Sequence, residues 1–153
     1  MKRALLARPS SLIVENMRRF MTTLGLEPTR LNTADELHQY EADEVGCIVI
    51  STALSSTVKE SYCEIVKKVR STFPGKPIFI ASFADIKRSK VIVRSKFKSG
   101  DCDIELLCME EAARQVPLDF AAFCVLITND EIKSDPALSE SVKRFQSLFT
   151  IPV

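Results

Sequence analysis

Several apolar, β-forming stretches of this chain end at side chains that can take part in chemistry. These side chains are Arg8 after residues 3–7, Ser51 and Thr52 after residues 46–50, and Ser82 after residues 77–81. A guanidinium and hydroxyls can together bind an anion, and a serine hydroxyl can act as a nucleophile when a base is oriented toward it. The single histidine, His38, is expected on a short surface helix away from these strand ends. The sequence therefore favours binding over hydrolase chemistry, although a strand-end serine can also simply satisfy nearby backbone groups.

Other catalytic and cofactor chemistries lack their sequence patterns. The four glycines stand singly, which excludes a Walker loop and a dinucleotide-binding fingerprint. The five cysteines are odd in number and match no zinc spacing, so we expect small buried side chains in a reducing cytoplasm. We expect no cofactor, no metal ion and no enzymatic activity.

The composition indicates one soluble globular domain. The chain has 153 residues, of which 46% are hydrophobic and 27% charged, with 21 Lys and Arg against 20 Asp and Glu. This balance offers no overall field for nucleic acid or anionic lipid. The first residues, MKRALLARPSS, hold too short an apolar run for a signal peptide or a membrane span, so we expect a cytoplasmic protein without membrane contact.

The first 82 residues alternate between strand and helix patterns. Strands are expected at 3–7, 28–32, 47–51 and 77–82. An apolar stripe from Ile13 to Leu24 predicts a first helix, and Thr33 with Glu36 predicts a capping box that opens a short helix. The apolar spacing over 58–73 predicts a long amphipathic helix. Unbroken apolar strands separated by helices predict a parallel sheet covered on both faces.

Two segments after Ser82 stay open between alternatives. Residues 83–98 form either a helix leading into a strand at 102–107, or one arm of a β-hairpin over 90–108 that turns at residues 99–100. The β-branched run KVIVR and favourable cross-strand charge pairs favour the hairpin. Residues 120–128 form either a buried strand or a buried helix turn, and a final helix is expected over 136–149.

This layout resembles the receiver domain of bacterial response regulators, a flavodoxin-like (CheY-like) three-layer α/β fold. The stretch RALLARPSSLIVENMRRFMTTLG is similar to the receiver opening, GCIVIST to its third strand and KPIFIAS to its fourth. The resemblance covers roughly residues 3–100. It implies a single receiver-like domain over 1–153, with a core of about 3–109, a mainly parallel central sheet, and a C-terminal helical extension of about 110–153.

The family's chemical residues are mostly replaced. The resemblance places the receiver's acidic pair at Arg8 and Pro9, its phospho-acceptor aspartate at Ser51, and its fifth-strand lysine near Leu107, where no lysine stands. Only Ser82 matches a functional residue, the Ser or Thr that contacts the phosphoryl group. Magnesium needs oxygen ligands, and a guanidinium at about 4 Å would repel a divalent ion by roughly 8 kcal/mol at an effective dielectric of about 20. Ser51 is then what remains of a phosphorylation site.

The sequence therefore predicts a degenerate receiver that binds a protein partner without phosphoryl transfer. The receiver's signalling surface corresponds here to the remodelled segment 83–109, and its cations are the expected partner contacts: Lys87, Arg88, Lys90, Arg94, Lys96 and Lys98. The final helix either covers the exposed side of the sheet or offers a contact for a homodimer. One alternative is a small-molecule or nucleotide site in which Arg8, Ser51, Thr52 and Ser82 hold an anion. A third hypothesis, nucleic-acid contact through the basic segment 87–98, is weaker because Phe97 is the only aromatic residue within it.

Overall fold

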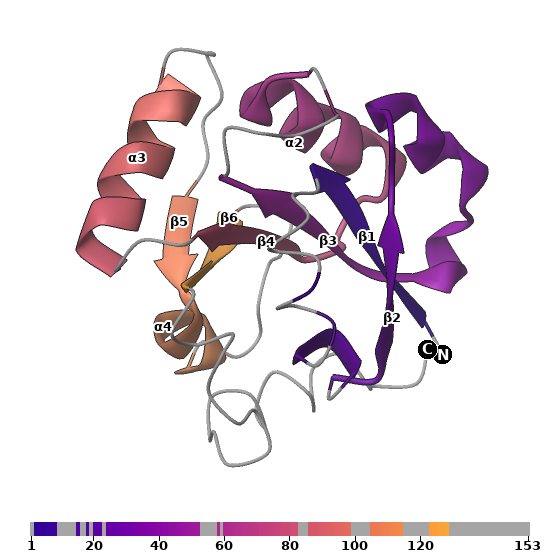
Figure 1. Ribbon diagram of the computed structural model, residues 1–153, viewed down its shortest axis with the longest axis horizontal. Coiled ribbons are helices and arrows are strands. Elements are labelled where there is room, and N and C mark those ends of the chain that lie inside the picture. Colours follow the sequence, from indigo (N-terminus) through magenta and orange to yellow (C-terminus); the bar gives the residue numbers. More distant parts are fainter. Residues whose placement is uncertain are drawn as a thin grey trace.

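The core of the molecule is a six-stranded parallel sheet with helices on both faces (Figure 1). The computed structural model describes residues 2–8, 15, 18, 20–22, 24–52, 58, 60–82, 86–98, 105–114 and 123–128. The strands are β1 Lys2–Arg8, β2 Leu26–Arg30, β3 Val45–Ser51, β4 Ile78–Ser82, β5 Glu105–Cys108 and β6 Phe123–Thr128. Their order across the sheet is β2-β1-β3-β4-β6-β5, and every neighbouring pair is parallel. The predicted α/β class is confirmed.

The face of the sheet on which each helix lies follows from the direction in which the chain crosses the sheet. They are the 3-10 helices η1 Ala34–Gln39 and η2 Ala42–Glu44, and the α-helices α2 Tyr62–Thr72, α3 Ile86–Lys98 and α4 Met109–Arg114. From β2 through β5 the chain moves in one direction across the sheet, and from β5 to β6 it turns back. Because parallel crossovers are right-handed, reversing direction moves the connecting helix to the opposite face.

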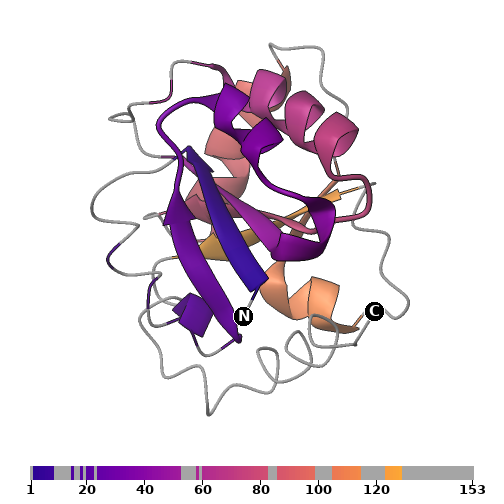
Figure 2. The same cartoon turned by 90° about the vertical axis from the view of Figure 1, so that its right-hand side faces the viewer.

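The two faces carry separate apolar clusters. Phe20 and Met21 are helical residues between β1 and β2. Together with Met109 and Ala112 of α4 they pack against one face of the sheet, which we call the α4 face. Leu37 of η1 joins apolar residues of α2 and α3 against the other, which we call the α2 face. Figure 2 shows α2 and α4 on opposite sides of the strands. The predicted three-layer arrangement is therefore present.

Most of the expected early elements form, with one difference in capping. Gly25 has a φ of 77°, as expected of a residue that ends a helix. Thr33 makes no side-chain cap to η1; instead Glu36 Oε2 accepts from the Asn32 backbone N–H at 3.1 Å. The predicted capping box is therefore wrong, because a 3-10 turn places the Thr33 carbonyl, 3.3 Å from the Glu36 amide, where the hydroxyl was expected to bind. The helix predicted over 58–73 starts later, at α2, where the Ser61 hydroxyl accepts from the Glu64 amide at 3.3 Å.

The hairpin favoured over 90–108 is wrong, because this segment contains α3. Ser89 and Val93 lie four positions apart on its buried side, while Val91 between them is exposed. The β-branched residues do disfavour a helix locally, but burial of Val93 against the sheet compensates for that preference. The helix alternative, followed by a strand near 102–107, is confirmed by α3 and β5.

Residues 120–128 contribute a strand, not a helix turn. Strand β6 lies between β4 and β5, and Cys124, Val125, Leu126 and Ile127 are completely buried. This strand belongs to the stretch that the sequence analysis assigned to the extension, so the sheet reaches at least Thr128. The helix expected over 136–149 lies outside the described residues.

Candidate functional site

The carboxyl edge of the sheet brings together four strand ends with polar residues. Arg8 is the Cα partner of Ile50, one residue before Ser51. Ser51 is the partner of Ala81, and the next residue, Ser82, is the partner of Thr128. The parallel register therefore places Arg8, Ser51, Ser82 and Thr128 along one edge. In open parallel sheets this edge is where ligands bind.

The pleat of the strands separates these residues between the two faces. Side chains alternate along a strand, so Ser51 lies on the side of Cys47 and Val49, which is the α4 face. By the same alternation Ser82 lies with Ile80 on the α2 face. The structure thus brings Ser51 and Ser82 to one edge of the sheet but to opposite faces.

On the α2 face, the hydroxyls of Ser82, Ser89 and Thr128 lie at the junction of β4, β6 and α3. The Ser89 hydroxyl of α3 donates to Ser82 Oγ at 2.7 Å, and both side chains are buried. Their exposed fractions are 0% for Ser89, 2% for Ser82 and 3% for Thr128. A buried polar group must find a partner inside the protein, so this contact ties the first half of α3 to the end of β4.

Sequence reasoning missed Ser89 and Thr128. Thr128 ends an apolar run, as Ser51 and Ser82 do, but its strand was not distinguished from a helix turn. Ser89 precedes Val93 by four residues, and that helical spacing was a usable signal. The β-branched run KVIVR masks that signal, because it favours a strand locally.

Thr52 and Arg8 lie at the ends of β3 and β1, at the same edge of the sheet. The Thr52 backbone N–H donates to the Ala81 carbonyl at 2.9 Å, which continues the ladder between β3 and β4 beyond Ser51. Thr52 itself is half-buried. Arg8 is the last residue of β1, and its side chain lies outside the described residues.

The described strand ends do not fit a magnesium site of the receiver type. Their donors are neutral hydroxyls, and Ser51, Ser82 and Thr128 expose only 1%, 2% and 3% of their surface. Magnesium is held in proteins by carboxylates together with water. Within the described ranges, no three His, Cys, Asp or Glu side chains gather closely enough to hold a metal ion.

The predicted partner contacts on α3 differ in exposure. Lys87 and Arg88 are exposed, whereas Lys90 is half-buried and its Nζ lies 3.6 Å from Glu111 Oε1 of α4. Glu111 Oε2 also accepts from the Cys108 backbone N–H at 3.4 Å. The side chains of the remaining predicted contacts lie outside the described residues: Arg94, Lys96 and Lys98.

Four of the five cysteines match their expected place in the core. Cys47, Cys63, Cys108 and Cys124 are buried free thiols, and Cys102 lies outside the described residues. Burial raises the pKa of the Cys47 thiol well above its ordinary value. The thiolate is the reactive form, so Cys47 is chemically protected. His38 is exposed on η1, as expected.

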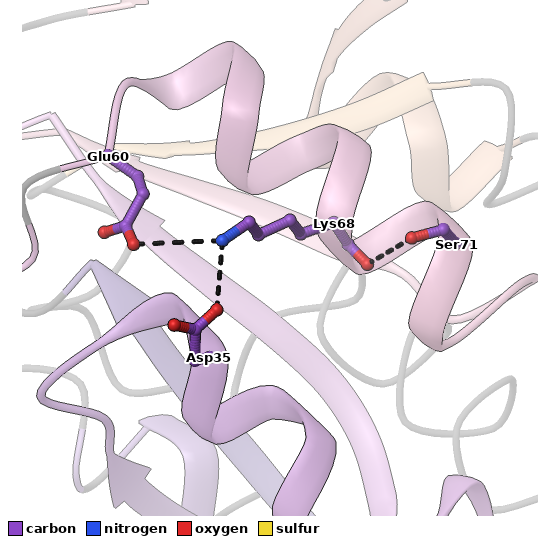
Figure 3. Close-up of polar contacts among 4 residues, drawn as sticks. All are labelled: Asp35, Glu60, Lys68 and Ser71. Atoms are coloured by element: carbon purple, nitrogen blue, oxygen red, sulfur yellow. Dashed lines mark hydrogen bonds and ion pairs between the residues drawn. The ribbon is translucent and has the colours of Figure 1, made fainter.

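An ion cluster lies at the start of α2. Lys68 Nζ of α2 lies 3.2 Å from Asp35 Oδ1 of η1 and 3.9 Å from Glu60 Oε1 (Figure 3). Glu60 stands just before α2, so the cluster joins the start of that helix to η1. Because all three side chains reach solvent, the cluster adds little to stability.

Comparison with solved structures identifies the architecture. A crystal structure of a response regulator receiver domain protein from Clostridium thermocellum superimposes with a TM-score of 0.51, covering 97% of this chain and 99% of that chain. The chain has a receiver-domain fold. The two sequences are 10% identical, so the likeness extends to the fold alone. No protein-family model and no curated protein sequence matches the chain.

Thr128, and not Leu107, is the neighbour of Ser82 in the sheet. The strand that pairs with β4 is β6, and its last residue, Thr128, is the neighbour of Ser82. Leu107 instead lies on the edge strand β5. Leu107, where the resemblance expects the fifth-strand lysine, therefore does not lie beside Ser82. None of the described helices is both long and apolar enough to cross a membrane.

Proposed function

We propose that this receiver-fold protein is a non-catalytic regulatory module that binds a protein partner independently of phosphorylation. The observation that carries the proposal is the Ser89–Ser82 hydrogen bond of 2.7 Å between α3 and β4. Ser82 matches the receiver residue that contacts a phosphoryl group. Here its hydroxyl is buried and bonded to α3, which supports a helix held in one position.

The residues at the other strand ends support the same proposal. Position 51 carries a neutral hydroxyl, which cannot form the acyl phosphate of an aspartate. Ser51 is also 1% exposed, so it is poorly placed for attack on a phosphodonor in solution. Arg8 and Pro9 stand where the resemblance expects the acidic pair.

In this proposal, α3 presents the partner-binding surface to a protein in the cytoplasm. Its basic segment carries Lys87 and Arg88 in exposed positions. A homodimer through this same surface is disfavoured, because two copies related by a twofold axis would oppose like charges.

Treatment with acetyl phosphate and magnesium tests the proposal. We expect the intact mass of the protein to stay unchanged, because no described strand end offers a carboxylate acceptor. An active receiver domain treated in parallel serves as the positive control. A stoichiometric phosphoryl adduct on this protein would refute phosphorylation independence.

The anion-binding alternative has weaker support. It requires Arg8, Ser51 and Ser82 to converge, whereas the strand pleat places Ser51 and Ser82 on opposite faces. A thermal-shift screen with phosphate and nucleotides tests it. A rise of several degrees that disappears in Arg8→Ala would revive this alternative.

A further inference from the structure

The exposed surface of the first half of α3 combines two features that are locally unfavourable for a helix. Lys87 and Arg88 stand in the first turn, which holds no acidic residue, and Val91 follows them. Residues three and four positions apart share one side of a helix, so these three side chains form a single surface. We call Lys87, Arg88 and Val91 the α3 patch.

The cations of the α3 patch oppose the helix dipole. The amino end of a helix carries a partial positive charge and favours acidic side chains in the first turn. Among the described helices, α2 follows this rule, with Glu64 in its first turn. The sequence places Asp85 before α3, outside the described residues, but Lys87 and Arg88 still lie at the unfavourable end.

Val91 adds an apolar side chain on the same side of α3 as these cations. Its side chain is 68% exposed, and it is the one large hydrophobic residue so exposed among those the structure describes. A lone exposed apolar residue is ordinary on a protein surface. Here it is also β-branched, which disfavours a helix without any compensating burial. A position that breaks a local rule without compensating burial, as Val91 does, is where a functional site is expected.

Lys90 is excluded from the patch because it is half-buried, whereas Lys87 and Arg88 are exposed. Lys90 is also paired with Glu111 at 3.6 Å, so its charge is already partly neutralised. Ser89 faces the opposite way, buried against Ser82. The surface available to a partner is therefore narrower than the whole basic segment.

We infer that the α3 patch binds an acidic amphipathic segment of a partner protein, with carboxylates toward Lys87 and Arg88 and an apolar side chain on Val91. This inference rests on the proposed function and specifies the partner's chemistry. An acidic segment would be complementary to the exposed cations and to the positive end of the helix dipole. The exposed Val91 favours a protein over nucleic acid, because phosphate contacts gain nothing from an apolar side chain.

Titration of the full chain with designed probes tests the inference. The first probe is a short helical peptide with Glu on its polar side and Leu on its apolar side. The others are the same peptide with Lys replacing Glu, a Glu-Ser peptide without Leu, and a short DNA duplex. Binding is followed by fluorescence anisotropy and by amide shifts of α3.

We expect the Glu-Leu peptide to bind more tightly than every other probe. The double variant Lys87→Glu with Arg88→Glu should weaken this binding by about tenfold or more, because it reverses both charges. Val91→Ser should weaken it by about threefold to tenfold through lost apolar contact. The matched control is Arg30→Glu with Lys67→Glu, which reverses two exposed cations on β2 and α2 and should bind as wild type.

Thermal unfolding separates lost contact from lost structure. Acidic residues in the first turn suit the helix dipole, so Lys87→Glu with Arg88→Glu should melt above the Arg30→Glu with Lys67→Glu control while binding less. Equal binding of the Lys-Leu peptide or the duplex, or wild-type binding by Val91→Ser or the Lys87→Glu with Arg88→Glu variant, would overturn the inference. These outcomes are independent of the acetyl phosphate result, which tests phosphorylation independence.

Discussion

At the scale of single residues, burial decides what the strand-end hydroxyls can do. A serine at a strand end can bind a ligand, accept a phosphoryl group or join two elements, and its residue type does not distinguish these roles. Ser82 is 2% exposed and accepts from Ser89, so its surroundings favour the joining role. The role of Ser89 depends on the packing of α3 against β4, which local sequence does not show.

Replacing Ser89 tests that joining role. We expect Ser89→Ala to lower the free energy of unfolding by about 1 kcal/mol, because a buried hydrogen bond is lost and alanine's better helix propensity offsets part of the cost. Urea denaturation measures the change. Ser71→Ala is the control, since Ser71 is exposed and its hydroxyl donates only to the Lys68 carbonyl; it should change stability by less than about 0.5 kcal/mol. Equal effects of the two variants would argue against the joining role.

At the scale of elements, α3 and α4 meet around the edge strand β5. The Lys90–Glu111 ion pair links the two helices, and Glu111 also accepts from the backbone of Cys108, the last residue of β5. Glu111 stands three residues after Cys108, which is the reciprocal half of a capping box at the start of α4. These contacts join α3, β5 and α4 at the β5 edge of the sheet, which is the edge opposite β2.

The pH dependence of stability reports on this link. Hydrogen bonding from Cys108, and then the charge of Lys90, lower the pKa of the Glu111 carboxyl below its ordinary value. A depressed carboxyl pKa contributes stability above the unfolded-state pKa, and this contribution is lost as the pH falls through the folded-state pKa. We expect the stability gap between wild type and Glu111→Gln to be widest near neutral pH and to close below about pH 4.

Urea unfolding of both proteins between acidic and neutral pH measures that gap. The contribution is small, because the Glu111 side chain is 47% exposed and solvent screens the ion pair. Parallel pH profiles for the two proteins would show that Glu111 does not supply this contribution.

At the scale of the whole molecule, the sheet is completed by a strand from late in the sequence. Strand β6 enters between β4 and β5, so the central core depends on residues 123–128. Any fragment that ends before β6 leaves β4 paired with β3 on one side but without a partner strand on the other. We therefore expect the sheet to unfold as one unit together with β6.

A truncated chain tests this dependence. We expect residues 1–114 to lack a cooperative unfolding transition, because removing β6 leaves one edge of β4 unpaired, removes the strand that pairs with β5 and takes away the buried side chains of β6. Circular dichroism during thermal unfolding measures the transition. As a control in the full chain, Leu126→Ala should keep the cooperative transition and cost about 2–5 kcal/mol. A sharply melting fragment would show that the sheet is stable without β6.

The amino-acid sequence by itself determined the α/β class, the first four strands, the helix after β3 and the positions of Arg8, Ser51 and Ser82 at strand ends. Those features follow from local apolar periodicity and from the carboxyl ends of parallel strands meeting at one edge. Only the tertiary structure decided that the KVIVR segment is helical, that β6 lies between β4 and β5, and that Ser51 and Ser82 occupy opposite faces. Each of these depends on contacts between residues far apart in the chain, and such burial can override a local preference.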